Sequence, residues 1–246
     1  LNITLDALVN LDTVNTKATA TINVIGADLQ GLGIMKRNVK TGMDISLEFN
    51  GNLNSYKVDA DVTNGAVVYE NRTYLLGSII ANGFVDKDTT SVSIKNKLID
   101  LDLQSNTDPA TFSKSIQEHI ASYFYRDVVV KDSVKKPVDL KLKTKIAQTS
   151  LLSDVFLVNV KDLDTINLSV DFNEANRKLD AKITAPHINY SGNELDSLAF
   201  TMNTDQDNFN FKLGFKEILA NPLNIPRTII TGNQTNNELS LNFAGY

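Results

Sequence analysis

The sequence predicts an all-β fold built mainly from antiparallel strands. Apolar and polar residues alternate over most of the 246 residues, and this alternation gives a strand one apolar face and one wet face. Asn- and Gly-rich turns separate the alternating stretches. Strands buried on both faces would instead read as continuous apolar runs. We therefore expect an antiparallel meander with one face in water.

The alternating stretches run from one end of the chain to the other. In each, apolar residues recur at every second position, which is the period of a half-buried strand. The predicted strands cover residues 18–24, 43–49, 56–62, 138–142, 166–172, 179–183, 198–202, 209–215 and 239–243.

Turns are predicted where Asn and Gly gather, because these residues tolerate positive φ. The segment 204–208 joins two alternating runs and predicts a hairpin, and 221–226 contains two prolines and predicts a loop or an edge segment. The remaining predicted turns are 49–53, 64–65, 82–83, 191–193 and 233–237.

One amphipathic helix, near residues 108–125, interrupts the strands. Asp108 suits the N-cap and Pro109 the first turn. The apolar residues that follow at helical spacing are Phe112, Ile116, Ile120, Tyr123 and Phe124. We expect this face to pack on the apolar side of the sheet, with docking of a partner as the alternative. A shorter helical turn is expected over 150–157.

Residues 1–246 are expected to form a single continuous β segment, with a possible break around the helix at 108–126. Hydrophobic residues make up 42% and charged residues 22%, which is enough to build a core. The net charge of -5 disfavours nucleic acid as a partner. The chain starts at Leu1 and shows no signal peptide or apolar run of about 20 residues. We expect a fragment of a longer secreted or periplasmic bacterial protein.

No catalytic constellation is recognisable, so no enzyme activity, catalytic residue or cofactor is expected. The two histidines, His119 and His187, are far apart in sequence, and a zinc site would lack ligands because cysteine is absent. Most Asp-x-Asp pairs are expected to lie on the solvent-exposed faces of strands, because residues two apart share a face. The pairs at 86–88 and 205–207 leave weak calcium binding as an alternative, although the Gly and distal Glu of an EF-hand are missing. No metal site is predicted.

Several short sequence segments resemble TamB-like translocation and assembly module proteins of Bacteroidetes, which belong to the AsmA-like group. The resemblance is carried by 195–205 (LDSLAFTMNTD), 208–213 (NFNFKL) and 232–243 (GNQTNNELSLNF). The helix after Asp108 and the segment 150–157 (SLLSDVFL) are similar in sequence character to proteins of that family. The similarity covers mainly the second half of the chain.

The resemblance implies a periplasmic protein, tethered to the inner membrane through a segment outside these residues. Its sheet would be long, curved and U-shaped in section, with an apolar inner groove. Family members are linked to lipid transport between the two membranes, outer-membrane biogenesis and protein secretion. The implied partners are phospholipid acyl chains and an outer-membrane assembly protein.

The groove hypothesis singles out the largest inward side chains of the last strands. The candidate lipid-groove residues are Phe200, Met202, Phe209, Phe211, Leu213, Phe215, Leu241 and Phe243. Two alternatives remain open at this point. The apolar faces could close on each other as a structural or adhesive β-sandwich, or an open sheet edge could pair with outer-membrane protein strands.

Overall fold

The computed structural model describes residues 2–12, 15–124, 136–147, 150–156, 160–235 and 238–246. They form one sheet of 17 strands, one α-helix and one short π-helical segment. The helices are α1 (Pro109–Ala121) and η1 (Leu152–Phe156). The strands are β1 (Asn2–Asn10), β2 (Thr16–Asp28), β3 (Val39–Gly51), β4 (Tyr56–Tyr69), β5 (Arg72–Val85), β6 (Thr90–Lys95), β7 (Ile99–Ser105), β8 (Asp139–Ile146), β9 (Val160–Leu163), β10 (Ile166–Asn173), β11 (Lys178–Tyr190), β12 (Asn193–Thr204), β13 (Asn208–Phe215), β14 (Glu217–Ala220), β15 (Leu223–Ile225), β16 (Thr228–Thr235) and β17 (Glu238–Gly245).

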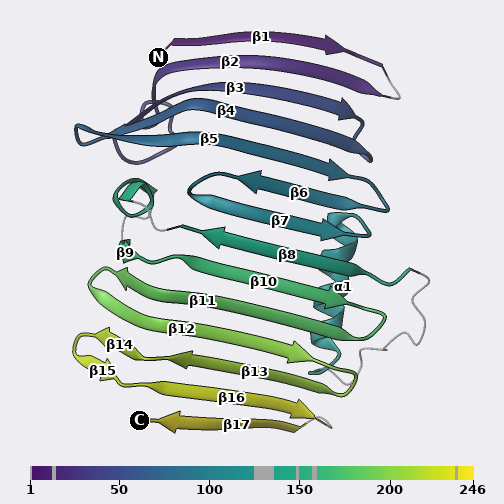
Figure 1. Cartoon of the computed structure of the whole chain (residues 1–246), viewed down its shortest axis with the longest axis vertical. Coiled ribbons are helices and arrows are strands. Elements are labelled where there is room, and N and C mark those ends of the chain that lie inside the picture. The colour runs from purple at the N-terminus through teal and green to yellow at the C-terminus, as the bar shows by residue number, and fades with distance from the viewer. Residues whose placement is uncertain (1, 13–14, 125–135, 148–149, 157–159, 236–237) are drawn as a thin grey trace.

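The strands follow one another as an antiparallel meander (Figure 1). β1 to β8 pair in sequence order, β8 pairs with β10, and the ladder continues through β11, β12, β13, β16 and β17. β9 pairs with the end of β11, and the small β14–β15 hairpin pairs with the start of β12. The open, curved, antiparallel sheet confirms the predicted all-β fold class.

The strand register gathers the apolar residues onto one face of the sheet. Two rows of directly opposed residues cross 14 strands, from β1 to β17. The first row is Ala7, Ala20, Leu47, Ala60, Ala81, Ile94, Leu101, Thr144, Leu168, Ile183, Phe200, Leu213, Ile230 and Phe243. The second row is Val9, Ala18, Phe49, Val58, Gly83, Val92, Leu103, Leu142, Val170, Ala181, Met202, Phe211, Gly232 and Leu241. We call the surface that carries these rows the apolar face and the opposite surface the polar face.

Helix α1 lies on the apolar face, as the sequence predicted (Figure 1). Asp108 caps it, because its carboxylate accepts hydrogen bonds from the backbone N–H groups of Ala110 and Thr111 at 2.9 and 3.0 Å. The apolar side of the helix packs on a buried cluster of the sheet. Its contacting residues are Phe112, Ile116 and Ile120, and the cluster is Val138, Leu140, Phe172 and Leu179.

A second cluster lies under η1, at the other end of the strands. Leu151 and Val155 pack with residues of β3, β4 and β5. Tyr74 donates a hydrogen bond from its hydroxyl to the Asp154 carboxylate at 2.8 Å, and Arg37 donates to the Asp154 carbonyl at 2.9 Å. The helical turn expected over 150–157 is thus present up to residue 156, and residue 157 lies outside the described residues.

Two predicted turns proved wrong, and both lie inside strands. Asn64 and Gly65 form a β-bulge in β4, where Asn64 adopts φ 53° and the register to β5 shifts. A Cβ on Gly65 would come within 2.9 Å of the Leu76 side chain, so glycine is needed for this close approach. Gly83 sits in the β5 ladder between Val58 and Val92, because pairing on both sides holds it extended.

The hairpin at 204–208 and the edge segment at 221–226 are confirmed. Asp205 holds the hairpin turn, since its carboxylate accepts hydrogen bonds from the backbone N–H groups of Asp207 and Asn208. The proline-containing segment forms the β14–β15 hairpin at one side of the sheet. Residues 233–235 continue β16, which pairs through Thr235 with Glu238 of β17.

Candidate functional site

The eight predicted groove residues all lie on the apolar face. Phe200 and Met202 are on β12, the four residues of the set between 209 and 215 are on β13, and the last two are on β17. The register places Phe200 opposite Leu213 and Met202 opposite Phe211. The structure therefore brings the predicted residues together on one continuous surface.

Phe209 differs from the other members of this set because it is buried, with 7% of its surface exposed. Its ring lies 5.8 Å from the Tyr123 ring and 5.1 Å from the Phe124 ring, measured between centroids. These two aromatic residues follow α1 directly. Phe209 is therefore part of the contact that fixes the end of the helix to the sheet, and it is not available as an open groove position.

Phe211 and Gly232 fit together on neighbouring strands. A Cβ on Gly232 would come within 2.0 Å of the Phe211 ring, so the ring lies directly against the glycine backbone. No local sequence pattern predicts this contact, because the two residues are opposed only through the β13–β16 register.

Leu241 and Phe243 lie on β17, which pairs with a neighbour on one side only in the described structure. Their side chains are 48% and 68% exposed. These are the most accessible of the eight residues, because no further strand covers their outer flank.

Phe200, Leu213 and Phe215 are half-buried although no second sheet covers them. The described residues form one sheet, so the partner layer that a β-sandwich requires is not among them. Helix α1 covers one end of the strands and η1 lies near the other end (Figure 1). Side chains between the helices gain their partial burial from neighbours in the same rows.

The apolar face extends far beyond the eight predicted residues. Ile22, Ile45 and Leu47 continue it in the N-terminal half. The alternation that predicted these strands also identifies these positions as apolar. The candidate set was instead limited to strands that carry large aromatic side chains and lie where the family resemblance is found.

The histidines lie in separate places. His119 is buried on α1 and its Nε2 lies 2.8 Å from the hydroxyl oxygen of Thr204. Burial lowers the pKa of His119 from 6.5 to about 4, with the nearby Arg177 charge as the smaller cause. His187 lies on β11 opposite Asp196. The described part of the chain contains no group of three or more His, Asp or Glu side chains placed to hold a metal ion.

The carboxylates of the two Asp-x-Asp turns bind backbone N–H groups and a lysine of the chain itself. Asp86 accepts a hydrogen bond from the backbone N–H of Asp88 at 2.7 Å, and Asp88 forms an ion pair with Lys136. This ion pair holds the pKa of Asp88 below its usual value. These contacts explain the acidic residues as turn and surface interactions.

The edges of the sheet are a further feature of the described structure. Among the residues that the structure describes, β1 pairs only with β2, and β17 pairs only with β16. Neither strand contains Lys, Arg or Pro, the residues with which many proteins protect an edge against strand addition. Every described residue of β1 is exposed.

Comparison of the chain with protein-family models, curated proteins and solved structures gave no match. Among the described helices, none has both the length and the apolar character needed to cross a membrane.

Proposed function

We propose that the apolar face binds phospholipid acyl chains, in a protein that supports lipid transport between membranes and outer-membrane protein assembly. The observation that carries this proposal is the continuity of the two apolar rows across 14 strands. Adjacent strands lie about 4.8 Å apart, so the rows extend over roughly 60 Å. The resemblance to TamB-like proteins supports the periplasmic setting and the inner-membrane tether.

The physical basis is the transfer of hydrocarbon from water to an apolar surface. Each buried CH₂ group contributes about 0.8 kcal/mol, so a dozen groups contribute on the order of 10 kcal/mol. A strand of about six residues is ~20 Å long, which is comparable to an acyl chain. The first row offers an apolar residue at every strand except β8, where it holds Thr144, so a chain could move along it while its head group remains in water.

Leu213→Glu tests this function, because it places a charge in the first row on β13, two strands from the end of the row at β17. An unpaired charge in an apolar site costs several kcal/mol, and each 1.4 kcal/mol lowers affinity about tenfold. We expect native mass spectrometry and lipid extraction to show bound phospholipid on the wild-type protein. The variant should retain at most about a tenth of it.

Thr231→Glu is the matched control, because it adds the same charge on the exposed polar side of the neighbouring strand β16. It should bind lipid as the wild type does. Phe243→Glu is a second test at a position that is already 68% exposed and should fold normally. A folded protein that neither carries nor takes up phospholipid, or equal lipid binding by folded Leu213→Glu, would refute the proposal.

The composition of β1 and β17, which lack Lys, Arg and Pro, supports a second candidate function, pairing of either strand with strands of outer-membrane proteins. Backbone N–H and C=O groups on the free side of an edge strand can add a further strand. This function is compatible with lipid binding, since it uses the sheet edge and not the apolar face.

A further inference from the structure

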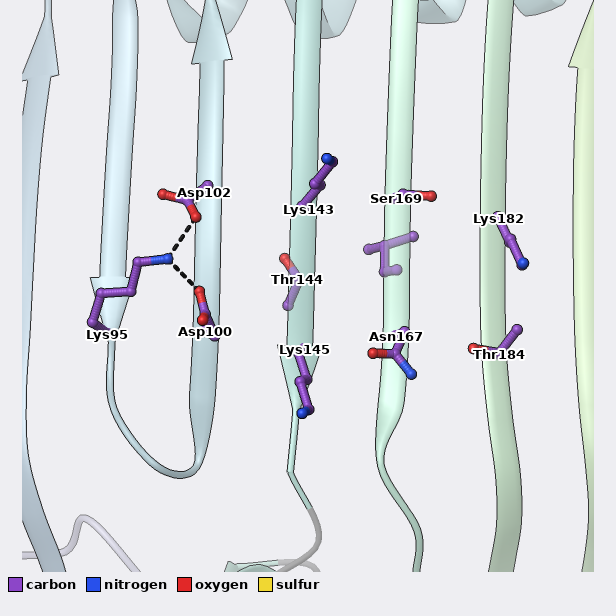
Figure 2. A pocket seen from close by; sticks show the side chains of 11 residues that line it. Lys95, Asp100, Asp102, Lys143, Thr144, Lys145, Asn167, Ser169, Lys182 and Thr184 are labelled. Atoms are coloured by element: carbon purple, nitrogen blue, oxygen red, sulfur yellow. Dashed lines mark hydrogen bonds and ion pairs between the residues drawn. The ribbon is translucent and has the colours of Figure 1, made fainter.

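The polar face carries a hollow over the centre of the sheet, opposite to the apolar face. It has a volume of about 550 Å³ and is lined by side chains of β6, β7, β8, β10 and β11 (Figure 2). The proposed function makes no use of it.

The hollow exists because short side chains separate long ones. Asn167 and Ser169 of β10 lie between Lys143 and Lys145 on β8 and Lys182 on β11 (Figure 2). The register sets Ser169 directly between Lys143 and Lys182. β8 and β11 are two strand spacings apart, about 9.6 Å, which leaves room for a small anion above the β10 side chains.

The charges of the hollow do not cancel. Lys95 donates hydrogen bonds to Asp100 and Asp102, at 2.5 Å each, and its bond to Asp102 lowers the pKa of that carboxyl. In the β7–β8 register Asp102 lies opposite Lys143 and Asp100 opposite Lys145, but among the described ion pairs none joins a carboxylate to the lysines of β8 or to Lys182. Four lysines and two aspartates line the hollow and give it a net charge of +2, whereas the whole chain carries -5.

Two further acidic residues lie on this face beside the hollow, Asp171 next to Ser169 along β10 and Asp180 next to Lys182 along β11. Asp171 lies opposite Lys141, and Asp180 forms an ion pair with Lys178 at 3.0 Å. Within the lining itself the lysines still outnumber the carboxylates by two, and Asn167 and Ser169 add an amide and a hydroxyl donor.

We propose that this hollow is a binding site for a phosphate-type oxyanion. Lys143, Lys145 and Lys182 supply the charge, and Ser169 and Asn167 donate neutral hydrogen bonds from the floor. Phosphate suits such a site because it has several acceptor oxygens and more than one negative charge, and ammonium groups bind it as point charges. The site is independent of the apolar face and would persist if lipid binding were disproved.

Inorganic pyrophosphate is the probe, titrated into the isotopically labelled protein with detection by amide NMR shifts. We expect saturable shifts at the backbone amides of β8, β10 and β11, weaker at higher salt because the contacts are exposed. The double variant Lys143→Ala/Lys182→Ala should bind at least about tenfold more weakly, because it removes two of the three ammonium groups that bind the anion.

Lys57→Ala/Lys114→Ala is the control, because it removes the same charge from two exposed lysines outside the hollow. It should leave the affinity unchanged. Equal weakening in both variants, or shifts that do not saturate and spread over all lysines, would overturn the proposal. Competition by phosphatidate vesicles, but not by phosphatidylcholine vesicles, would assign the bound phosphate to a lipid head group. Without competition it is assigned to a soluble anion.

Discussion

At the scale of single residues, His119 connects α1 to the sheet. Its ring contacts Phe172 at 5.2 Å and Tyr123 at 5.3 Å between centroids, and its Nε2 lies 2.8 Å from the Thr204 hydroxyl. Thr204 in turn accepts a hydrogen bond from the backbone N–H of Leu179. A charged imidazolium at this position would lose its hydration, so the neutral form is favoured in the folded protein.

This burial predicts a pH-dependent stability. The pKa of His119 is about 4 in the folded state and near 6.5 when unfolded. Between these values the unfolded state binds the additional proton, so stability falls as the pH decreases from about 6.5 towards 4. We expect the wild-type protein to lose about 2 kcal/mol from this residue between pH 7.5 and pH 5.

Urea unfolding at the two pH values measures this loss, and His119→Gln is the comparison because glutamine keeps a polar group without titrating. The difference in unfolding free energy between wild type and variant should shrink or reverse at pH 5. An unchanged difference would show that His119 is not buried in its neutral form.

The residue scale also shows what the sequence could not predict about the candidate site. All eight candidate residues lie on the apolar face, because alternation fixes the face once the register is set. The burial of Phe209 depends on Tyr123 and Phe124, which are more than 80 residues away in sequence. The Phe211–Gly232 contact likewise depends on register. Such tertiary contacts leave no local pattern.

At the scale of elements, the sequence predicted α1 and nine of the strands, but β1, β5, β6, β7 and β16 were not among the predicted strands. Asp108 and Pro109 marked the start of α1, and the structure has the helix and its cap there. The Asn64–Gly65 pair had the composition of a turn but forms a bulge, because β3 and β5 pair with β4 on both sides of it. The short strands β9, β14 and β15 had no alternation long enough to predict them.

Helix α1 also carries a prediction of its own. Asp108→Ala removes the acceptor for two N–H groups and should destabilise the protein by about 1 kcal/mol. Asp108→Asn should cost only a few tenths of a kcal/mol, because asparagine is an equally good cap. Urea unfolding measures both. If global stability is unchanged while amide exchange in α1 accelerates, the helix opens independently of the sheet.

At the scale of the whole molecule, the even number of strands in the main ladder gives the two edge strands opposite directions. Fourteen strands alternate in direction along the main ladder, so β1 and β17 run in opposite directions (Figure 1). The apolar rows reach both edges and end in Val9 on one side and Phe243 on the other. An added antiparallel strand with alternating residues would therefore extend both the ladder and the apolar face.

The edge-pairing function predicts protection of β1 or β17 by such a strand. The probe is a nine-residue peptide with the apolar/polar alternation of an outer-membrane barrel strand, and the control is a scrambled peptide of the same composition without alternation. Hydrogen exchange should slow at amides of β1 or β17 and remain unchanged in β7, which is paired on both sides. The scrambled peptide should give no protection, because its apolar residues would fall on both faces. Equal protection by both peptides would indicate non-specific apolar binding, and no protection at either edge would refute edge pairing.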